Sequence, residues 1–372
     1  MDIYIVRPGD SLYTVARRFC ADGAELALIN QLGDPDRLAV GQALIVPGKT
    51  AAPTQSRELC AYTYTGGSME TLRRALPCLT ALFPFCFRFS PEGSLLPPEG
   101  ELFAAEAAEN GVISFLTLAD LDGDGSFSPR LAHSIFTDEE AQKRLSDELL
   151  AVLEAKKLQG VQLFFQNLYP FDREAFSAFT EALSRQLHRA GYLLLSALPP
   201  EENGAPDAYD YALHGRCADR VVLTTYDWGH LYGPPRPVSP ADKIRSALCR
   251  AVKDVPPEKL LMGFSNYAYS WALPWRAGDR AVYMSNAAAQ NLAVAANAQI
   301  KFDPTARCPY FNYTDTVGQR RQVWFDDARS IRARLELMEE FSLAGIACWT
   351  LTPLWRPIFE LFSAGYETAK YM

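Results

Sequence analysis

The sequence has no long run of one charge and no long apolar segment. Its 372 residues carry 36 Lys and Arg against 44 Asp and Glu, which gives a net charge of −8, and the basic residues are dispersed. This dispersion argues against a nucleic-acid partner and against an anionic membrane surface. No stretch approaches the roughly 20 apolar residues that cross a bilayer. We therefore expect no nucleic-acid binding and no membrane insertion.

The sequence also lacks cysteine and histidine residues at the spacing that metal-binding sites require. The eight cysteines form no CxxC pair, and several lie in apolar strings such as PFCFRF and IACWT, as buried reduced thiols do. The four histidines are scattered. The run Asp120–Gly125 resembles the start of a calcium-binding loop, but Leu131 stands where such a loop needs glutamate. We expect a polar turn there, no metal and no cofactor.

The N-terminal residues, MDIYIVRPGDSL, lack a basic start followed by an apolar core. We therefore expect no signal peptide and synthesis in the cytosol.

A change of composition divides the chain into two units. Residues 49–57 are small and polar and read as a linker. Before them, residues 1–48 show a short strand, a turn that supplies a helix cap, two short amphipathic helices and a second strand. This order predicts a small βααβ domain.

The second unit, residues 58–372, repeats a strand followed by a helix. Such alternation implies parallel pairing, and eight repeats predict an α/β fold of the (β/α)8 TIM-barrel type. Between the last two strands, residues 279–325 predict a small α+β insertion above the barrel mouth. The eight expected strands are 59–64, 81–89, 112–118, 160–166, 192–198, 220–226, 260–267 and 345–351.

The first unit resembles a LysM module. The likeness covers YIVRPGDSLYTVARRF, INQL and VGQALIVP. It implies binding of N-acetylglucosamine-containing glycan, either peptidoglycan or chitin oligomers, in a groove between two loops. The implied groove residues are Gly9, Asp10, Ser11 and Leu12 on one side and Leu38, Ala39, Val40 and Gly41 on the other. Asp10 and Ser11 can equally serve only to cap the following helix.

The second unit resembles glycoside hydrolase family 18. LQGVQLFFQN stands where the family has an acidic DxDxE-type strand, and TTYDWG and GIACWT resemble two further family segments. YALHG, GPPRPVSP and YFNYTD are most similar to the LysM-bearing spore-cortex-lytic glycosylases of germination. The likeness implies a spore or cell-wall context, in the cortex or the coat.

The catalytic positions implied by this resemblance have lost their acids. In the family, a glutamate protonates the leaving oxygen and an aspartate two residues earlier orients the substrate's acetamido group, an exception to the scheme with two catalytic carboxylates. Here these positions hold Gln166 and Phe164, and Gln162 occupies the acidic position before them. Since an amide cannot release a proton near neutral pH, we expect a pseudoenzyme with no intact catalytic residue.

Residues that could hold a sugar remain. The resemblance assigns Tyr226 and Asp227 to the acetamido group and Trp349 to the floor beneath the central sugar. Aromatic faces stack on the apolar faces of sugars, so further platforms are expected from Tyr62, Trp228, Tyr269 and Trp271. The predicted function is glycan binding. Two alternatives stay open. One is an active N-acetylglucosaminidase with a substitute acid, for which Asp227 and a loop carboxylate are candidates, and the other is a structural scaffold of a spore coat.

Overall fold

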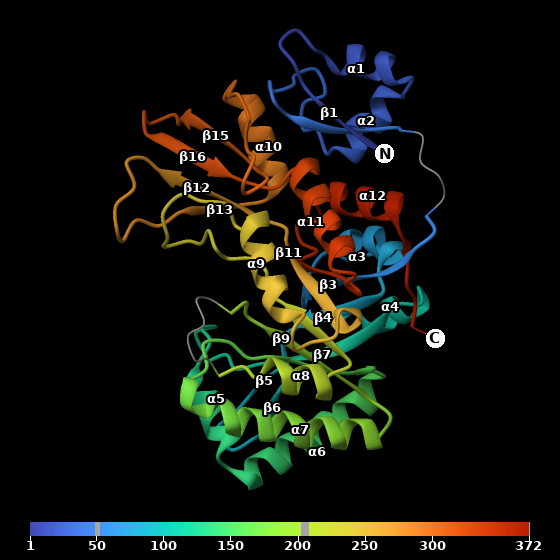
Figure 1. Ribbon diagram of the computed structural model, residues 1–372, viewed down its shortest axis with the longest axis vertical. Coiled ribbons are helices and arrows are strands. Elements are labelled where there is room, and N and C mark those ends of the chain that lie inside the picture. Colours follow the sequence, from blue (N-terminus) through green and yellow to red (C-terminus); the bar gives the residue numbers. More distant parts are fainter. Residues whose placement is uncertain (49–52, 202–207, 372) are drawn as a thin grey trace.

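The computed structural model describes residues 1–48, 53–201 and 208–371. The N-terminal domain consists of β1 (Asp2–Ile5), α1 (Leu12–Phe19), α2 (Gly23–Ile29) and β2 (Ala43–Val46), in the predicted order. Its two strands pair antiparallel, with Ile3 opposite Ile45. Part of the expected linker, residues 49–52, lies outside the described residues. The domain packs on one end of the larger unit (Figure 1).

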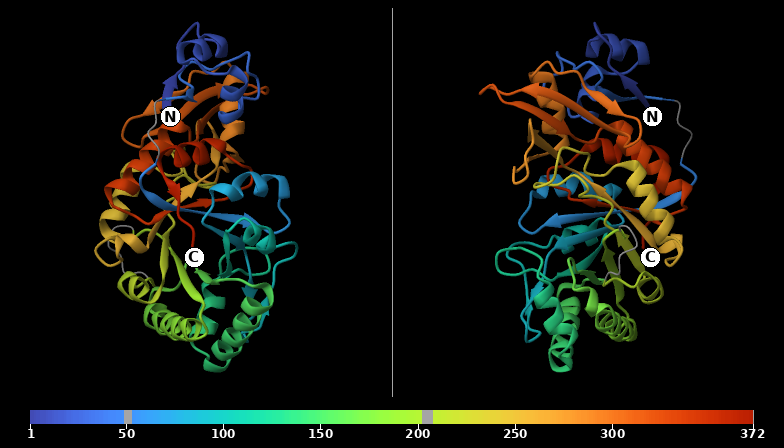
Figure 2. Two further views of the ribbon diagram at one scale, coloured as in Figure 1. Left: turned by 90° about the vertical axis from the view of Figure 1, so that its right-hand side faces the viewer. Right: turned by 60° about the vertical axis from the view of Figure 1, so that its left-hand side comes forward.

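The larger unit is the predicted closed parallel barrel, because the eighth strand pairs with both the seventh and the first (Figure 2). All eight expected strands are confirmed. In order around the barrel they are β3 (Ser56–Tyr64), β4 (Ala81–Phe85), β7 (Ile113–Ala119), β8 (Gly160–Phe164), β9 (Leu193–Leu198), β10 (Arg220–Leu223), β11 (Leu260–Ser265) and β17 (Gly345–Trp349).

Helices surround the barrel and bury one apolar face each. In α6 (Glu139–Lys156), for example, Leu145, Leu149 and Leu153 face the strands, and the Asp138 side chain caps the first turn. The other helices are α3 (Met69–Ala75), α4 (Ala104–Glu109), α5 (Pro129–Phe136), α7 (Arg173–Arg189), α8 (Tyr211–Cys217), α9 (Ala241–Ala251), α11 (Ala328–Glu340) and α12 (Arg356–Gly365). Short strands β5 (Arg88–Phe89), β6 (Leu95–Leu96) and β18 (Glu367–Thr368) complete the unit.

The insertion between the seventh and eighth barrel strands is a five-stranded antiparallel sheet with one helix, α10 (Asn286–Ala295). The sheet contains β12 (Ala268–Ala272), β13 (Val282–Met284), β14 (Lys301–Asp303), β15 (Cys308–Thr314) and β16 (Arg320–Trp324). It begins earlier than the expected residue 279, because β12 leaves the barrel strand at once and pairs with β13 and β16. The insertion stands beside the barrel mouth (Figure 1).

The N-terminal domain is fixed to the insertion through the loop before β2. The Ile300 backbone N–H donates to the Val40 carbonyl at 2.9 Å, and Arg329 on α11 donates to the Gly41 carbonyl at 3.1 Å. Ala39 is only 4% exposed and packs among apolar residues of the insertion. The two domains are therefore docked directly, through hydrogen bonds and apolar packing, rather than joined only by the linker.

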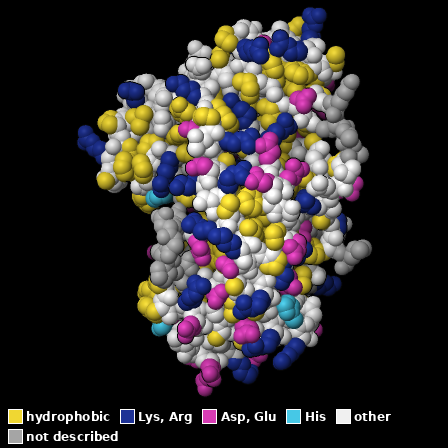
Figure 3. Space-filling view, in the orientation of Figure 1, with side chains coloured by type: hydrophobic (Ala, Val, Ile, Leu, Met, Phe, Trp, Pro, Cys, Tyr) yellow, Lys and Arg dark blue, Asp and Glu magenta, His cyan; other side chains and the backbone are white. Residues whose placement is uncertain are grey.

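Surface charge is mixed rather than concentrated. On the face drawn in Figure 3, basic and acidic side chains are interspersed, and hydrophobic side chains gather over the insertion at the upper left. This pattern agrees with the dispersed basic residues of the sequence.

Candidate glycan-binding cleft

In the family resemblance, β8 is the strand that carries the catalytic acids. Its side chains point alternately to the barrel interior and to the surrounding helices. Gln162 and Phe164 point inward and are 0% and 4% exposed, while Leu163 packs outward with the helical core. Gln166 follows the strand at the mouth and is partly exposed. The predicted register put all three side chains on the inner face of a strand 160–166. Gln162 and Phe164 lie there, whereas β8 ends at Phe164 and Gln166 lines the cleft beyond the strand.

Phe164 forms part of an aromatic floor. Its ring stacks on Trp349 at 5.4 Å between centroids and on Phe127 at 5.9 Å. Phe85 and Tyr62 meet it edge-on at 5.3 and 5.6 Å. A ring in this arrangement offers an apolar surface and no hydrogen-bonding atom. The site therefore has no anion at the position where the family resemblance calls for aspartate.

Gln166 is held by a buried carboxyl group on the neighbouring strand. Its backbone N–H donates to Asp120 Oδ1 at 3.0 Å, and Asp120 directly follows β7. Asp120 is 0% exposed, and burial raises its pKa to about 8 although the Gln166 hydrogen bond lowers it. At neutral pH the protonated, uncharged form of Asp120 therefore predominates next to the amide that replaces the acid.

Tyr226 and Asp227 follow β10 at the mouth. The Tyr226 ring lies roughly parallel to Trp349 at 6.3 Å. Asp227 adopts a left-handed backbone (φ 65°), and its carboxylate accepts a hydrogen bond from the Tyr267 hydroxyl. Part of the residue is exposed, but its carboxyl group is surrounded by protein, and this desolvation raises the pKa of Asp227.

These side chains line one cleft with a volume of 540 Å³. Of the predicted site residues, the cleft contains Phe164, Gln166, Tyr226, Asp227, Trp228 and Trp349. It also contains residues that the sequence did not single out: Phe127, Asn167, Pro199, Pro200 and Thr224. The added residues all follow the carboxyl ends of barrel strands, the one signal that could have found them.

Three expected platforms do not line the cleft. Tyr62 is 0% exposed and lies within the barrel, because it belongs to a deeper layer of inward-facing side chains. Trp271 is 1% exposed, and its Nε1 donates to the Gly233 carbonyl at 2.8 Å. Tyr269 is 6% exposed and packs with Trp271 in the core of the insertion. These rings support the wall of the cleft rather than form its surface.

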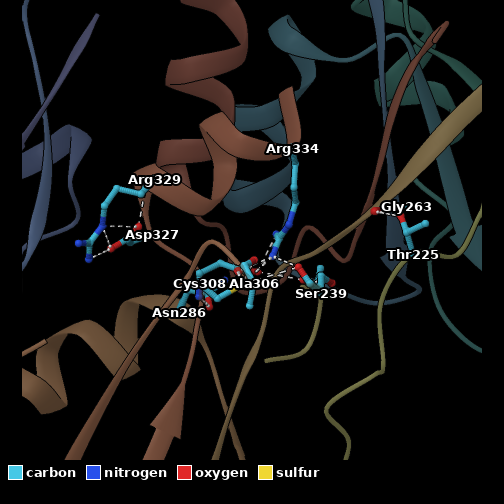
Figure 4. Close-up of polar contacts among 11 residues, drawn as sticks. Thr225, Ser239, Gly263, Asn286, Ala306, Cys308, Asp327, Arg329 and Arg334 are labelled. Carbon is cyan, nitrogen blue, oxygen red and sulfur yellow. Dashed lines mark hydrogen bonds and ion pairs between the residues drawn. The ribbon is translucent and has the colours of Figure 1, made fainter. Parts of the chain in front are cut away.

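A buried ion pair lies at the start of α11, directly after the insertion (Figure 4). Arg334 of α11 is 1% exposed and donates to the Asp326 carboxylate at 2.8 Å and to the Ser239 carbonyl at 3.0 Å. Ser265, at the end of β11, donates to the same carboxylate at 2.9 Å. The Asp326 backbone N–H donates to Asn286 Oδ1, at the start of α10, at 2.8 Å, so the same residue connects the ion pair with the insertion.

In the N-terminal domain, the side chains expected at the glycan groove already have partners. Ser11 caps α1 by accepting from the Thr14 backbone at 3.2 Å. The Asp10 carboxylate accepts from the Arg7 backbone at 2.8 Å and from the Tyr4 hydroxyl at 2.6 Å. The opposite loop, from Leu38 to Gly41, is the one docked on the insertion. Sugar contact by these residues stays a prediction.

The part of the chain that the structure describes contains no cluster of three or more potential metal ligands. Within the same residues, no helix is long and apolar enough to cross a membrane.

Comparison with known proteins gives two family matches. The model of glycosyl hydrolases family 18 matches residues 117–353, and the LysM domain model matches residues 4–47. The chain is 34% identical to the cortical fragment-lytic enzyme of Bacillus subtilis, over 94% of this chain and 95% of that protein.

Two solved structures cover nearly the whole fold. The spore cortex-lytic enzyme SleL of Bacillus megaterium superposes with a TM-score of 0.93 at 27% identity, over 100% of this chain and 99% of that one. SleL of Bacillus cereus superposes with a TM-score of 0.81 at 32% identity, over 99% of this chain and 87% of that one.

Proposed function

The chain belongs to glycosyl hydrolase family 18, and from this premise we propose that it binds N-acetylglucosamine-containing cell-wall glycan without hydrolysing it. The observation that carries the proposal is the stack of Phe164 on Trp349. It places an apolar ring in the floor of a cleft that otherwise keeps the groups needed to hold a sugar.

Loss of the acid accounts for the proposed inactivity. A glutamine at position 166 can hydrogen-bond to a glycosidic oxygen but cannot protonate it. General acid catalysis contributes typically 10²- to 10⁴-fold in rate. Phe164 removes a further electrostatic contribution of order 10²- to 10³-fold, if the lost aspartate acts like other preorganised groups.

Retained binding groups account for the proposed affinity. Trp349 and Trp228 offer aromatic surfaces to the sugar faces, and Tyr226 and Asp227 offer polar atoms to an acetamido group. The likeness to cortical and spore cortex-lytic enzymes supports spore-cortex peptidoglycan as the ligand. The cortex or the coat is then the expected location of the protein.

One observation favours a second candidate, an active N-acetylglucosaminidase. Asp227 is the single carboxylic acid among the described residues that line the cleft, and its pKa is raised, as a general acid requires. In this alternative Asp227 would protonate the leaving oxygen in place of the missing glutamate.

The test is a long incubation of the pure protein with spore-cortex and vegetative peptidoglycan, with soluble fragments read by mass spectrometry. We expect no new fragments above a heat-killed control, and we expect the double variant Phe164→Asp with Gln166→Glu to release some. Native hydrolysis as fast as that of the double variant would overturn the proposal. Native fragments that disappear in Asp227→Asn would establish the second candidate.

A glycan-binding measurement distinguishes a purely structural scaffold from both the binding protein and the active enzyme. Trp349→Ala should weaken binding of soluble N-acetylglucosamine oligomers if the cleft holds glycan. Undetectable glycan binding by the native protein would favour the scaffold.

A further inference from the structure

Strands β14, β15 and β16 of the insertion carry a group of side chains that lies outside the cleft (Figure 1). We call this group the outer strip, and it consists of Lys301, Tyr310, Asn312, Arg320 and Gln322. From its geometry and charge we infer that the outer strip is a second glycan-binding surface, which takes muramic acid residues with free lactyl carboxylates. The inference rests on the proposed function only in taking cell-wall glycan as the ligand.

The strand register brings the five side chains to one face of the sheet. Lys301 lies directly opposite Tyr310. Asn312 lies opposite Gln322 on the next strand, and Arg320 shares their face because it is two residues from Gln322. The other face of the sheet packs on α10. Lys301, Asn312 and Arg320 are exposed, and the other two are partly exposed, so a ligand can reach the outer strip from solvent.

Tyr310 supplies a fixed aromatic platform. Its ring stacks on Trp324, with 4.6 Å between the centroids and 24° between the planes. Trp324 is 9% exposed and belongs to the core of the insertion, so it holds the Tyr310 ring in place. A ring that is already held can stack on the C–H face of a sugar without a further loss of side-chain freedom.

A chain of hydrogen bonds beside this ring orients the two amides. Trp324 Nε1 donates to Gln322 Oε1 at 3.0 Å, and Gln322 Nε2 donates to Asn312 Oδ1 at 3.1 Å. Each amide oxygen therefore already accepts a hydrogen bond, and the chain ends at the NH₂ group of the exposed Asn312, which can only donate. Such a donor suits the carbonyl oxygen of an acetamido group or the oxygen of a sugar hydroxyl.

Two cations complete the outer strip. Lys301 and Arg320 have no ion-pair partner in the described part of the chain. The neighbouring Arg307 and Arg321 differ, because each of them pairs with a carboxylate. The whole protein has a net charge of −8, so two unpaired cations beside an aromatic ring are a local exception. Charge complementarity therefore favours an anionic sugar on this surface.

The spacing favours a carboxylate that is attached to the sugar itself. Side chains paired across neighbouring strands have Cβ atoms about 5 Å apart, so Lys301 lies next to any sugar that stacks on Tyr310. A lactyl carboxylate is joined to the sugar ring and stays within this reach, whereas the carboxylates of a stem peptide lie farther from the ring. Arg320 lies two strands and four residues away from Lys301, roughly 17 Å, so an oligosaccharide can contact both cations.

The experiment compares three ligands by isothermal titration calorimetry on the full chain at low ionic strength. The first is a peptide-free hexasaccharide that alternates N-acetylglucosamine with N-acetylmuramic acid and has free lactyl carboxylates. The second is the same hexasaccharide with each carboxylate converted to a methyl amide, which keeps the bulk and removes the charge. The third is a triglutamate peptide capped at both ends, which carries the same number of carboxylates without a sugar.

We expect the carboxylate hexasaccharide to bind the native protein at least about threefold more tightly than its methyl amide. The double variant Lys301→Gln with Arg320→Gln should abolish this preference. The matched control is Lys143→Gln with Arg185→Gln, which removes the same charge from α6 and α7 at the opposite end of the molecule (Figure 1). The control should keep the preference, because its cations are remote from the outer strip.

The aromatic part of the outer strip is tested by Tyr310→Leu, which keeps apolar bulk over Trp324 but removes the flat ring. It should weaken both hexasaccharides at least about threefold and leave any binding of triglutamate unchanged, because only sugars stack on the ring.

Equal affinity of the native protein for the two hexasaccharides would overturn the inference. So would a preference that survives in the double variant or disappears equally in the control. Triglutamate binding as tight as that of the carboxylate hexasaccharide would show a surface for acidic peptides instead. The proposed function is tested separately by Trp349→Ala and the uncharged N-acetylglucosamine oligomers, so its failure is distinguishable from a failure at the outer strip.

Discussion

Asp120 is a buried acid whose ionisation should set a measurable pH dependence of stability. Its side chain is 0% exposed, and burial raises its pKa from 3.8 to about 8. Because the folded pKa is above the unfolded one, the folded state binds this proton more tightly between about pH 4 and pH 8. The stability from Asp120 is therefore present at low pH and is lost as pH rises through 8.

The size of the effect follows from the shift. From pH 8 down to pH 5, the contribution of Asp120 to the free energy of unfolding grows by about 1.4 kcal/mol per pH unit, or about 4 kcal/mol in total. Asp120→Asn keeps an oxygen that can accept from the Gln166 N–H but cannot ionise. Relative to the native protein, this variant should gain about 4 kcal/mol in unfolding free energy between pH 5 and pH 9.

Urea unfolding followed by tryptophan fluorescence at the two pH values measures this gain. Asp147→Asn, which changes an exposed aspartate on α6, serves as the control, and its effect should stay below about 0.5 kcal/mol at either pH. A difference between Asp120→Asn and native protein that is the same at pH 5 and pH 9, within about 1 kcal/mol, would show that Asp120 is already ionised at pH 5 in the folded barrel.

Three other changes test separate parts of the structure. Trp349→Ala should reduce affinity for N-acetylglucosamine oligomers at least about tenfold in a titration, because a central aromatic platform is lost. Tyr267→Phe removes the hydrogen bond that lowers the pKa of Asp227, so this pKa should rise further, and any pH dependence of glycan binding should move to higher pH. Gly41→Ala should lower stability by about 1–3 kcal/mol in thermal unfolding, since its Cβ would lie 2.0 Å from the Ile300 carbonyl. Gly9→Ala, with the same φ of +86° and no atom within 4 Å, should cost less, and an equal cost would assign the effect to backbone strain.

The barrel could be predicted from the sequence because its strands are short apolar runs separated by amphipathic helices. Each run is buried on both faces and is therefore continuously apolar, so the sequence shows where the strand lies even when its packing is unknown. The start of the insertion was misplaced for the opposite reason. The expected strand 260–267 runs past the end of β11, and only tertiary pairing shows that β12, which starts at Ala268, belongs to the sheet of the insertion.

The cleft was predicted in part. Period-two alternation tells which side chains of a strand face the barrel interior, and Phe164 lies on that face. Trp349 was assigned from the family resemblance, and both residues line the cleft. It does not tell how deep a side chain lies, so Tyr62 was expected at the surface although it is in the interior. Loop residues such as Phe127 and Pro199 carry no period at all, and only the folded chain brings them to the mouth.

The docking of the N-terminal domain could not have been predicted, because its hydrogen bonds join groups far apart in the sequence and most of them pair a side chain with a backbone atom. The Val40 and Gly41 carbonyls accept hydrogen bonds from Ile300 and Arg329. A pattern of side chains in the sequence does not indicate which backbone carbonyls lie in an interface. The consequence for function is specific. These carbonyls belong to the loop that the LysM resemblance assigns to sugar recognition, and each already accepts a hydrogen bond inside the protein. A sugar bound there must use the remaining lone pairs or the facing loop. The barrel cleft, which is lined by aromatic rings and amides, is therefore the stronger candidate for the main glycan contact.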